Sequence, residues 1–216
     1  MLKLVIIFIS FFLVTVFSDA QETVTKWDMV QNKDGIQVYS RNNSLSNIKE
    51  VKVVSKINTS LSALVYLIKD ADNQPNWAYK LSYVEQIKNY NDKHWCTYAV
   101  ADVPWPLEDR DNVTDVNLVQ NKDSSIVISS KSVDNMVVEK DDKVRIPFIK
   151  ASWTFKPINN GKIEVSFQLL TDLGGYVPDW IVNLFIEKGP YETLWYYRIE
   201  AEKDRYKNIH LNYIVE

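Results

Sequence analysis

His94 and Cys96 come nearest, among the residues of this chain, to a pair whose side chains could do chemistry. They lie two positions apart, so on a β-strand they share one face. Together they offer two ligands, whereas a zinc site needs three or four from the protein. His210, the only other histidine, lies near the C-terminal end, and the chain has no second cysteine. We therefore predict no metal site.

The same pair makes a weak nucleophile and base. Two side chains on one face of the same strand are poorly oriented for a hydrogen bond between nucleophile and base. The sequence also identifies no third group that would orient His94. The chain also lacks a serine in a nucleophile elbow, a glycine-rich phosphate loop and a dinucleotide-binding fingerprint. We predict no catalytic residues and no cofactor.

Charge is densest at Glu108–Asp111, and a second acidic pair stands at Asp141-Asp142. The surroundings of Asp141-Asp142 are rich in charge, which favours a solvated turn over paired acid and base work. We also interpret Glu108, Asp109 and Asp111, the three acids of the first cluster, as residues of a solvated turn. The net charge of −3 gives no reason to expect a nucleic acid as partner.

The composition is that of an ordinary globular domain. Of 216 residues, 46% are hydrophobic and 25% charged, enough for one domain with its own core. The chain also has seven tryptophans and twelve tyrosines. Such an excess of aromatic side chains fills a core or lines a cavity for an apolar ligand.

The N-terminal segment resembles a signal peptide. Lys3 precedes an apolar run at Leu4–Phe17, and small residues at Ser18 and Ala20 fit the positions that a signal peptidase reads. We predict cleavage near Ala20, export to the periplasm or the medium, and one domain over residues 21–216. An uncleaved anchor is the alternative. With a single cysteine, the exported chain has no internal disulfide.

Apolar periodicity and turn residues predict two strands, a helix and then a long antiparallel run. The strands are expected at Ile36–Arg41, Ile48–Ile57, Tyr83–Tyr90, His94–Ala101, Asn112–Val119 and Ser125–Lys131, followed by a hairpin of Lys150–Ile158 and Lys162–Leu170. The helix is expected from a cap at Thr59 or Ser60 to about Asp72, and a short helical turn at Trp27–Val30. Asn160-Gly161 suits the turn of the hairpin.

The last long segment, from Pro178 to about Tyr206, is predicted to be an amphipathic helix. Its apolar face is wide, and we expect it to stay docked through Leu194, Trp195 and Ile199. Gly189-Pro190 should kink or split it. A helix with so wide an apolar face needs a large apolar partner. The fold class is therefore α+β, with a curved antiparallel sheet around a long C-terminal helix.

Two motifs are similar to those of the START domain, the lipid-binding helix-grip module. One is PWPLEDRDNV at Pro104–Val113, and the other runs from WTFKP at Trp153 to DLGGYVPDWIVN, which ends at Asn183. The likeness covers the chain from about Trp27 to Tyr206. It implies a U-shaped sheet that encloses a tunnel for one lipid, with the C-terminal helix across it.

The resemblance also suggests which residues line the tunnel. The arginine of the Arg110-Asp111 pair can project inward and meet an acid, and a buried arginine is costly unless it is paired. Arg145 is a weaker candidate of the same kind. The predicted lipid-binding residues are Arg110, Arg145, Tyr98, Trp153, Phe167, Ile181, Leu184 and Phe185.

The resemblance implies a protein that binds, and transfers, a lipid or another hydrophobic small molecule. Two alternatives stay open: a cyclase-like or hydrolase-like enzyme of the same fold, and an interaction protein whose cavity is filled by its own side chains. We expect a monomer that touches membranes transiently. We also expect a gate formed by Gly174-Gly175 and one half of the terminal helix.

Overall fold

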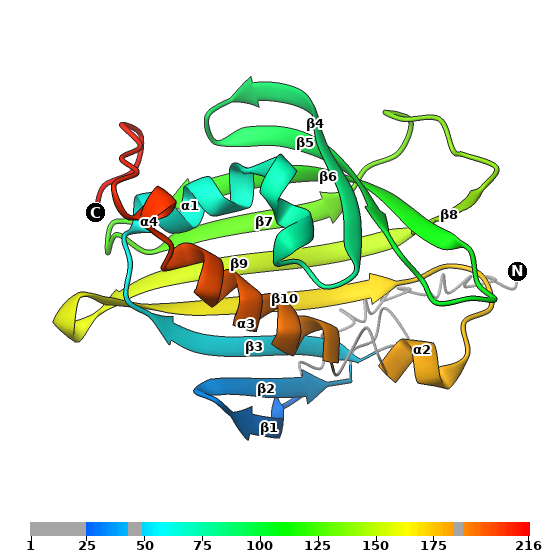
Figure 1. Ribbon diagram of the computed structural model, residues 1–216, viewed down its shortest axis with the longest axis horizontal. Helices are drawn as coiled ribbons and strands as arrows, with labels where there is room; N and C mark the ends of the chain where they lie inside the picture. The colour runs from blue at the N-terminus through cyan, green and yellow to red at the C-terminus, as the bar shows by residue number, and fades with distance from the viewer. Residues whose placement is uncertain (1–24, 43–48, 184–187) are drawn as a thin grey trace, which may run out of the picture.

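The computed structural model describes residues 25–42, 49–183 and 188–216. Within these ranges a ten-stranded sheet carries helices α1 and α3 across one of its faces (Figure 1). The strands are β1 (Asp28–Lys33), β2 (Ile36–Arg41), β3 (Glu50–Ile57), β4 (Leu81–Asn91), β5 (His94–Ala101), β6 (Asp109–Gln120), β7 (Ile126–Ser132), β8 (Lys143–Arg145), β9 (Phe148–Ile158) and β10 (Lys162–Asp172). The helices are α1 (Leu61–Lys69), α2 (Asp179–Asn183), α3 (Gly189–Ala201) and α4 (Asp204–Lys207), with 3₁₀ turns at Ala71–Asn76 and Asn159–Gly161.

The strand order is β1-β2-β3-β10-β9-β7-β6-β5-β4, and these neighbours are antiparallel. The sheet thus joins its N-terminal strands to the later ones through the hairpin β9–β10. The hairpin turns at Asn160 and Gly161, whose φ angles are 69° and 67°. Such angles suit asparagine and glycine better than other residues. The arrangement confirms the predicted α+β helix-grip fold.

Helix α1 begins where the sequence indicated. The side chain of Ser60 accepts a hydrogen bond from the Ala63 N–H at 3.1 Å, as a helix cap does. Glu216, at the other end of the chain, adds two more acceptors: its carboxylate receives the N–H groups of Leu61 and Ser62 at 2.8 and 2.9 Å. The side chain of Glu216 therefore caps the N-terminus of α1 together with Ser60.

Helix α3 carries the apolar face that packs on the sheet. Leu194, Tyr197 and Ala201 are fully buried, and the Tyr197 hydroxyl donates to the Leu64 carbonyl of α1 at 2.7 Å. Pro190 lies in the first turn of α3, where a missing N–H costs nothing. Helices α2 and α3 are described as Asp179–Asn183 and Gly189–Ala201, so Gly189-Pro190 begins α3, and residues 184–187 lie outside the described part of the chain.

Three details of the sequence prediction were wrong. Trp27–Val30 was expected to be helical, but Asp28–Lys33 is an edge strand, mostly exposed, so its sequence shows no alternation. Lys143–Arg145 forms a short strand that pairs parallel to β6, within a run expected to be antiparallel. Ile199 is 42% exposed, because the buried face of α3 follows Leu194, Tyr197 and Ala201.

Candidate functional site

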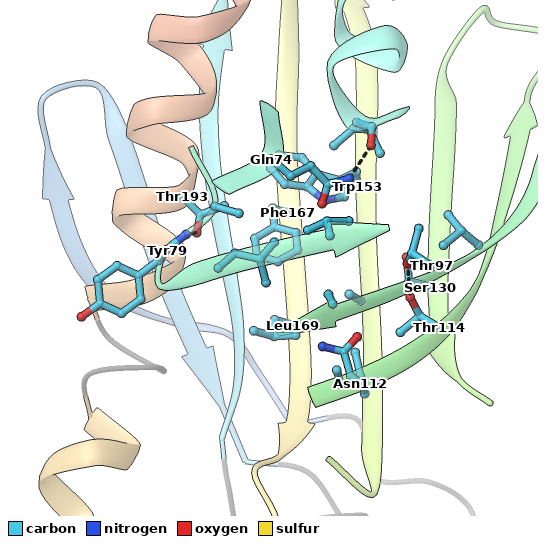
Figure 2. A pocket seen from close by; sticks show the side chains of 18 of the residues that line it. Gln74, Tyr79, Thr97, Asn112, Thr114, Ser130, Trp153, Phe167, Leu169 and Thr193 are labelled. Atoms are coloured by element: carbon cyan, nitrogen blue, oxygen red, sulfur yellow. Dashed lines mark hydrogen bonds between the residues drawn. The ribbon is translucent and has the colours of Figure 1, made fainter. Parts of the chain in front are cut away.

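A cavity of about 250 Å³ lies between the sheet and the helices (Figure 2). Strands β4 to β7, β9 and β10 form most of its wall, and the 3₁₀ turn after α1 and the start of α3 complete it. Its apolar lining is Ile68, Trp77, Ala78, Leu81, Val84, Trp95, Ala99, Val116, Ile149, Ala151, Trp153, Phe167, Leu169 and Pro190. One water needs roughly 10–15 Å³ of such space, so the cavity has room for an organic ligand.

Aromatic rings form one wall of this cavity. Trp153 and Phe167 face each other across the β9–β10 pair and stack with centroids 4.5 Å apart. Tyr197 of α3 packs on Trp153 at 4.6 Å, and Trp77 meets Tyr197 edge-on at 5.0 Å. Burial raises the pKa of Tyr197 well above its usual value, so its hydroxyl stays neutral. The cluster is a rigid support for whatever occupies the space beside it.

A strip of uncharged polar side chains forms another wall. Thr97 on β5, Asn112 and Thr114 on β6, and Ser130 on β7 all line the cavity. Thr97 and Thr114 are register partners, and their Oγ1 atoms lie 2.9 Å apart. Ser130 is opposite Val116, so alternation along β6 puts it on the same face as Thr114. The strip offers donors and acceptors without charge.

Arg110 is buried, with 3% of its surface exposed, but it lies outside the residues that line the cavity. Its Nε donates to the Leu173 carbonyl at 3.3 Å and its Nη2 to the Gly174 carbonyl at 3.4 Å, while Nη1 binds the Glu108 carbonyl. Burial lowers the pKa of Arg110, against the opposing effect of Glu108 and Asp109. The arginine therefore holds the exit of β10, and a direct contact with ligand stays a prediction.

Arg145 meets an acid, as the sequence suggested for Arg110. Its Nε donates to Oδ1 of Asp111 at 2.7 Å and its Nη2 to Oδ2 at 3.0 Å. The hydrogen bonds that Arg145 donates to Asp111 raise the pKa of Arg145 despite its partial burial. The pair joins β8 to β6 outside the cavity lining.

The remaining predicted residues differ in where the structure places them. Trp153 and Phe167 line the cavity together. Tyr98 does not, since it alternates with Thr97 and Ala99 on β5 and packs with Val100 and Val113 on the other face. Ile181 packs in a small cluster that includes Val103, Ile146 and Leu173. Leu184 and Phe185 lie outside the described residues.

Sequence reasoning missed the polar strip and Trp77. The spacing Asn112, Thr114, Val116 on β6 was the available signal, since alternate residues share a face. This signal was ambiguous because every residue from Arg110 to Thr114 is buried, so both faces of β6 are covered. Only the pairing with β5 and β7 tells which face lines the cavity.

His94 and Cys96 share one face, as predicted, and Asp115 supplies the orienting group that the sequence did not reveal. Its Oδ1 lies 2.6 Å from His94 Nε2 and 3.5 Å from Cys96 Sγ. Burial raises the pKa of Cys96, which keeps the thiol protonated and unreactive. These side chains do not line the cavity, and in the described residues no group of three or more His, Cys, Asp or Glu forms a metal site.

An internal, largely apolar cavity between a wrapped sheet and a C-terminal helix defines a helix-grip protein. The START domain family model matches residues 14–194, and the chain belongs to this family. Among the residues that the structure describes, no helix is long and apolar enough to cross a bilayer.

Similar protein sequences and solved structures agree with membership of the START domain family. An uncharacterized protein of Pseudomonas aeruginosa is 28% identical over 177 residues, covering 82% of this chain and 87% of the relative. The phosphatidylcholine transfer protein of Mus musculus is 24% identical over 176 residues, covering 77% and 79%. A STAR-related lipid transfer protein fragment from Xanthomonas axonopodis superposes with a TM-score of 0.76 at 26% identity, covering 82% of this chain and 99% of that one. Human StAR-related lipid transfer protein 5 gives 0.74 at 17% identity, with 82% and 86% covered, which concerns the fold alone.

Proposed function

We propose that this protein binds a lipid or another hydrophobic ligand in the cavity and carries it between membranes. The observation that supports this most directly is the mostly apolar wall around a space of about 250 Å³. An apolar cavity favours a ligand that removes its own apolar surface from water. The lipid transfer proteins among its relatives support the same conclusion.

Binding is tested by extracting the purified protein with organic solvent and identifying co-purified lipid by mass spectrometry. Ala151→Trp should fill the cavity and abolish co-purification, because Ala151 lines it from β9. Lys150→Trp adds the same ring at the next, exposed position and should leave the lipid bound. Circular dichroism checks that both variants fold. Lipid-free wild-type protein that takes up no added lipid would contradict the proposal and favour the filled-core alternative.

A non-enzymatic role is part of the proposal. Among the described residues that line the cavity, none is a carboxylic acid, a histidine, a lysine or a cysteine, and Tyr79 is the one titratable side chain, so the cavity offers few groups for general acid–base chemistry. An aromatase/cyclase is among the structural relatives at 11% identity, which speaks for the fold alone. Chemical change of a bound ligand during incubation with the protein would argue for an enzyme.

Export is proposed from the N-terminal sequence: a signal peptide over residues 1–20, removed near Ala20, and a mature protein in the periplasm or medium. N-terminal sequencing of protein from the exported fraction should begin at or near Gln21. A chain there that still begins with Met1 would favour an anchor.

Transient membrane contact is proposed at one end of the fold. Trp105 and Tyr176 are 89% and 85% exposed, and Trp180 of α2 is half exposed. Their segments belong together, because neighbouring residues of the three pack in one cluster that contains Val103 and Ile181. Exposed tryptophan and tyrosine suit the interface of a bilayer.

We further propose that the protein is a monomer, which sedimentation equilibrium would check.

A further inference from the structure

The polar strip of the cavity consists of Thr97, Asn112, Thr114 and Ser130. Figure 2 shows these four side chains grouped on one wall, on neighbouring strands. Thr114 and Asn112 are buried, with 6% and 9% of their surface exposed, and Thr97 and Ser130 are half-buried. A buried polar group that finds no partner costs free energy. The strip is therefore expected to bind a polar atom of whatever fills the cavity.

The hydrogen-bonding capacity of the strip is only partly used within the protein. Thr97 and Thr114 share one hydrogen bond at 2.9 Å, which uses one of their two hydroxyl hydrogens. Asn112 and Ser130 make no side-chain hydrogen bond to another described residue, while each can donate and accept. These groups match a hydroxyl or a carbonyl oxygen, which donates or accepts one or two hydrogen bonds.

The strip has no charge to offer an ionic ligand. No described residue that lines the cavity is charged, and the nearest candidates from the sequence are engaged elsewhere. Arg110 binds the carbonyls of Leu173 and Gly174, and Arg145 is paired with Asp111. Moving a phosphate or carboxylate into such a space without a counter-charge is strongly unfavourable.

We propose that the end of the ligand held inside the cavity is an uncharged hydroxyl or carbonyl group, bound by Thr97, Asn112, Thr114 and Ser130. The ligand class is thus a neutral lipid that enters with its polar end first, and a phosphate or carboxylate end is excluded. This inference rests on the proposed function, because it names the class of ligand that the cavity takes.

The test is displacement of a neutral fluorescent probe, N-phenylnaphthylamine, from the full mature chain. Three competitors share one alkyl chain: decanol, decanoate and decyl phosphate, all at pH 8. Decanol should displace the probe at a concentration at least about tenfold below that of either anion. Equal displacement by decyl phosphate or decanoate would overturn the inference.

Variants locate the effect in the strip. Thr114→Val keeps the shape and removes the hydroxyl, and Ser130→Ala is a second variant should the first fold poorly. With displacement corrected for the probe's dissociation constant measured on each variant, either should raise the decanol concentration needed by about threefold to tenfold. Thr154→Val is the matched control, because Thr154 alternates with the cavity-lining Trp153 on β9. An unchanged decanol requirement in both strip variants would overturn the inference.

The two proposals fail in different ways. If the probe binds and all three competitors displace it equally, the protein still binds hydrophobic ligands, and only the neutral polar end is wrong. If the probe does not bind the folded protein and no lipid co-purifies with it, the proposed function fails, and this inference fails with it.

Discussion

Arg145 holds Asp111 at two points, with Nε 2.7 Å from Oδ1 and Nη2 3.0 Å from Oδ2. The two residues are register partners on the parallel strands β8 and β6, and the Asp111 side chain is 1% exposed. The ion pair therefore adds a side-chain link to the backbone pairing of the three-residue strand β8 with β6.

The first prediction concerns this pair. Asp111→Ala leaves Arg145 without its acid in a largely buried position, which typically costs about 3–5 kcal/mol of the free energy of unfolding. Urea unfolding followed by circular dichroism measures the change. Asp142→Ala is the control, since Asp142 pairs with Lys143 at the exposed surface, and its loss should have little effect. Equal effects of the two variants would contradict a structural role for the buried pair.

A second prediction separates the two roles considered for Arg110. Arg110→Leu removes the donors that hold the carbonyls of Leu173 and Gly174, and should lower the free energy of unfolding by about 1.5–3 kcal/mol. The preference among decanol, decanoate and decyl phosphate should stay the same, because Arg110 does not line the cavity. Lys122→Met, at an exposed turn, controls for loss of charge. A changed preference at equal stability would instead place Arg110 in contact with ligand.

Much of the fold follows from patterns that are visible in the sequence. His94–Ala101 and Ile36–Arg41 were predicted with the bounds that the structure gives, because turn residues bracket each of them. The cap at Ser60 and the turn at Asn160-Gly161 rest on local hydrogen bonding and backbone preference, which short segments determine. These features need no knowledge of distant residues.

The polar part of the site needed knowledge of distant residues. Whether Asn112 and Thr114 or their neighbours line the cavity depends on how β6 pairs with β5 and β7. The direction of Arg110 depends on Leu173 and Gly174, more than sixty positions away. Trp153 was easier, because a tryptophan within an alternating apolar strand usually points into the core.

Glu200 gives a prediction about pH. Burial alone would raise the pKa of Glu200, but hydrogen bonds from Lys203, Asn73 and Arg205 outweigh it and lower the pKa. Asn73 and Arg205 donate to Oε2 at 3.1 and 2.9 Å, which links α3 to the turn after α1. A pKa lowered by folding means that the carboxylate stabilises the protein above its unfolded pKa of about 4.3.

That stabilisation should disappear as pH falls through the lowered pKa of Glu200. In Glu200→Gln, the free energy of unfolding should be lower at pH 7 by about 1.5–3 kcal/mol and should depend less on pH below about 4.3. Urea unfolding across the acid range gives both values. Glu202→Gln, exposed at the end of the same helix, is the control. If the free energy of unfolding of Glu200→Gln depends on pH as steeply as that of the wild type, Glu200 does not cause this pH dependence.

Cys96 should be inert while the protein is folded. The residue is 1% exposed, and burial raises the pKa of its thiol, so little thiolate is present near pH 8. Dithionitrobenzoate should label it slowly in native protein and at once in urea. Fast labelling of the native state would mean that β5 opens locally, or that the thiol is activated, and would renew the case for an enzyme.

The last prediction concerns the exposed aromatic residues Trp105 and Tyr176. Each is more than four-fifths exposed, although the exposure of apolar surface to water costs free energy. Their insertion into a bilayer interface would hold the protein at the membrane long enough for a ligand to pass. Trp105→Ala with Tyr176→Ala should slow ligand transfer between vesicles by about tenfold, and ligand affinity in solution should not change. Met29→Ala with Val30→Ala removes exposed apolar side chains from β1 and should leave the rate as it is. An equal loss of rate in both double variants would show general stickiness, and an unchanged rate in the first would move the membrane contact elsewhere.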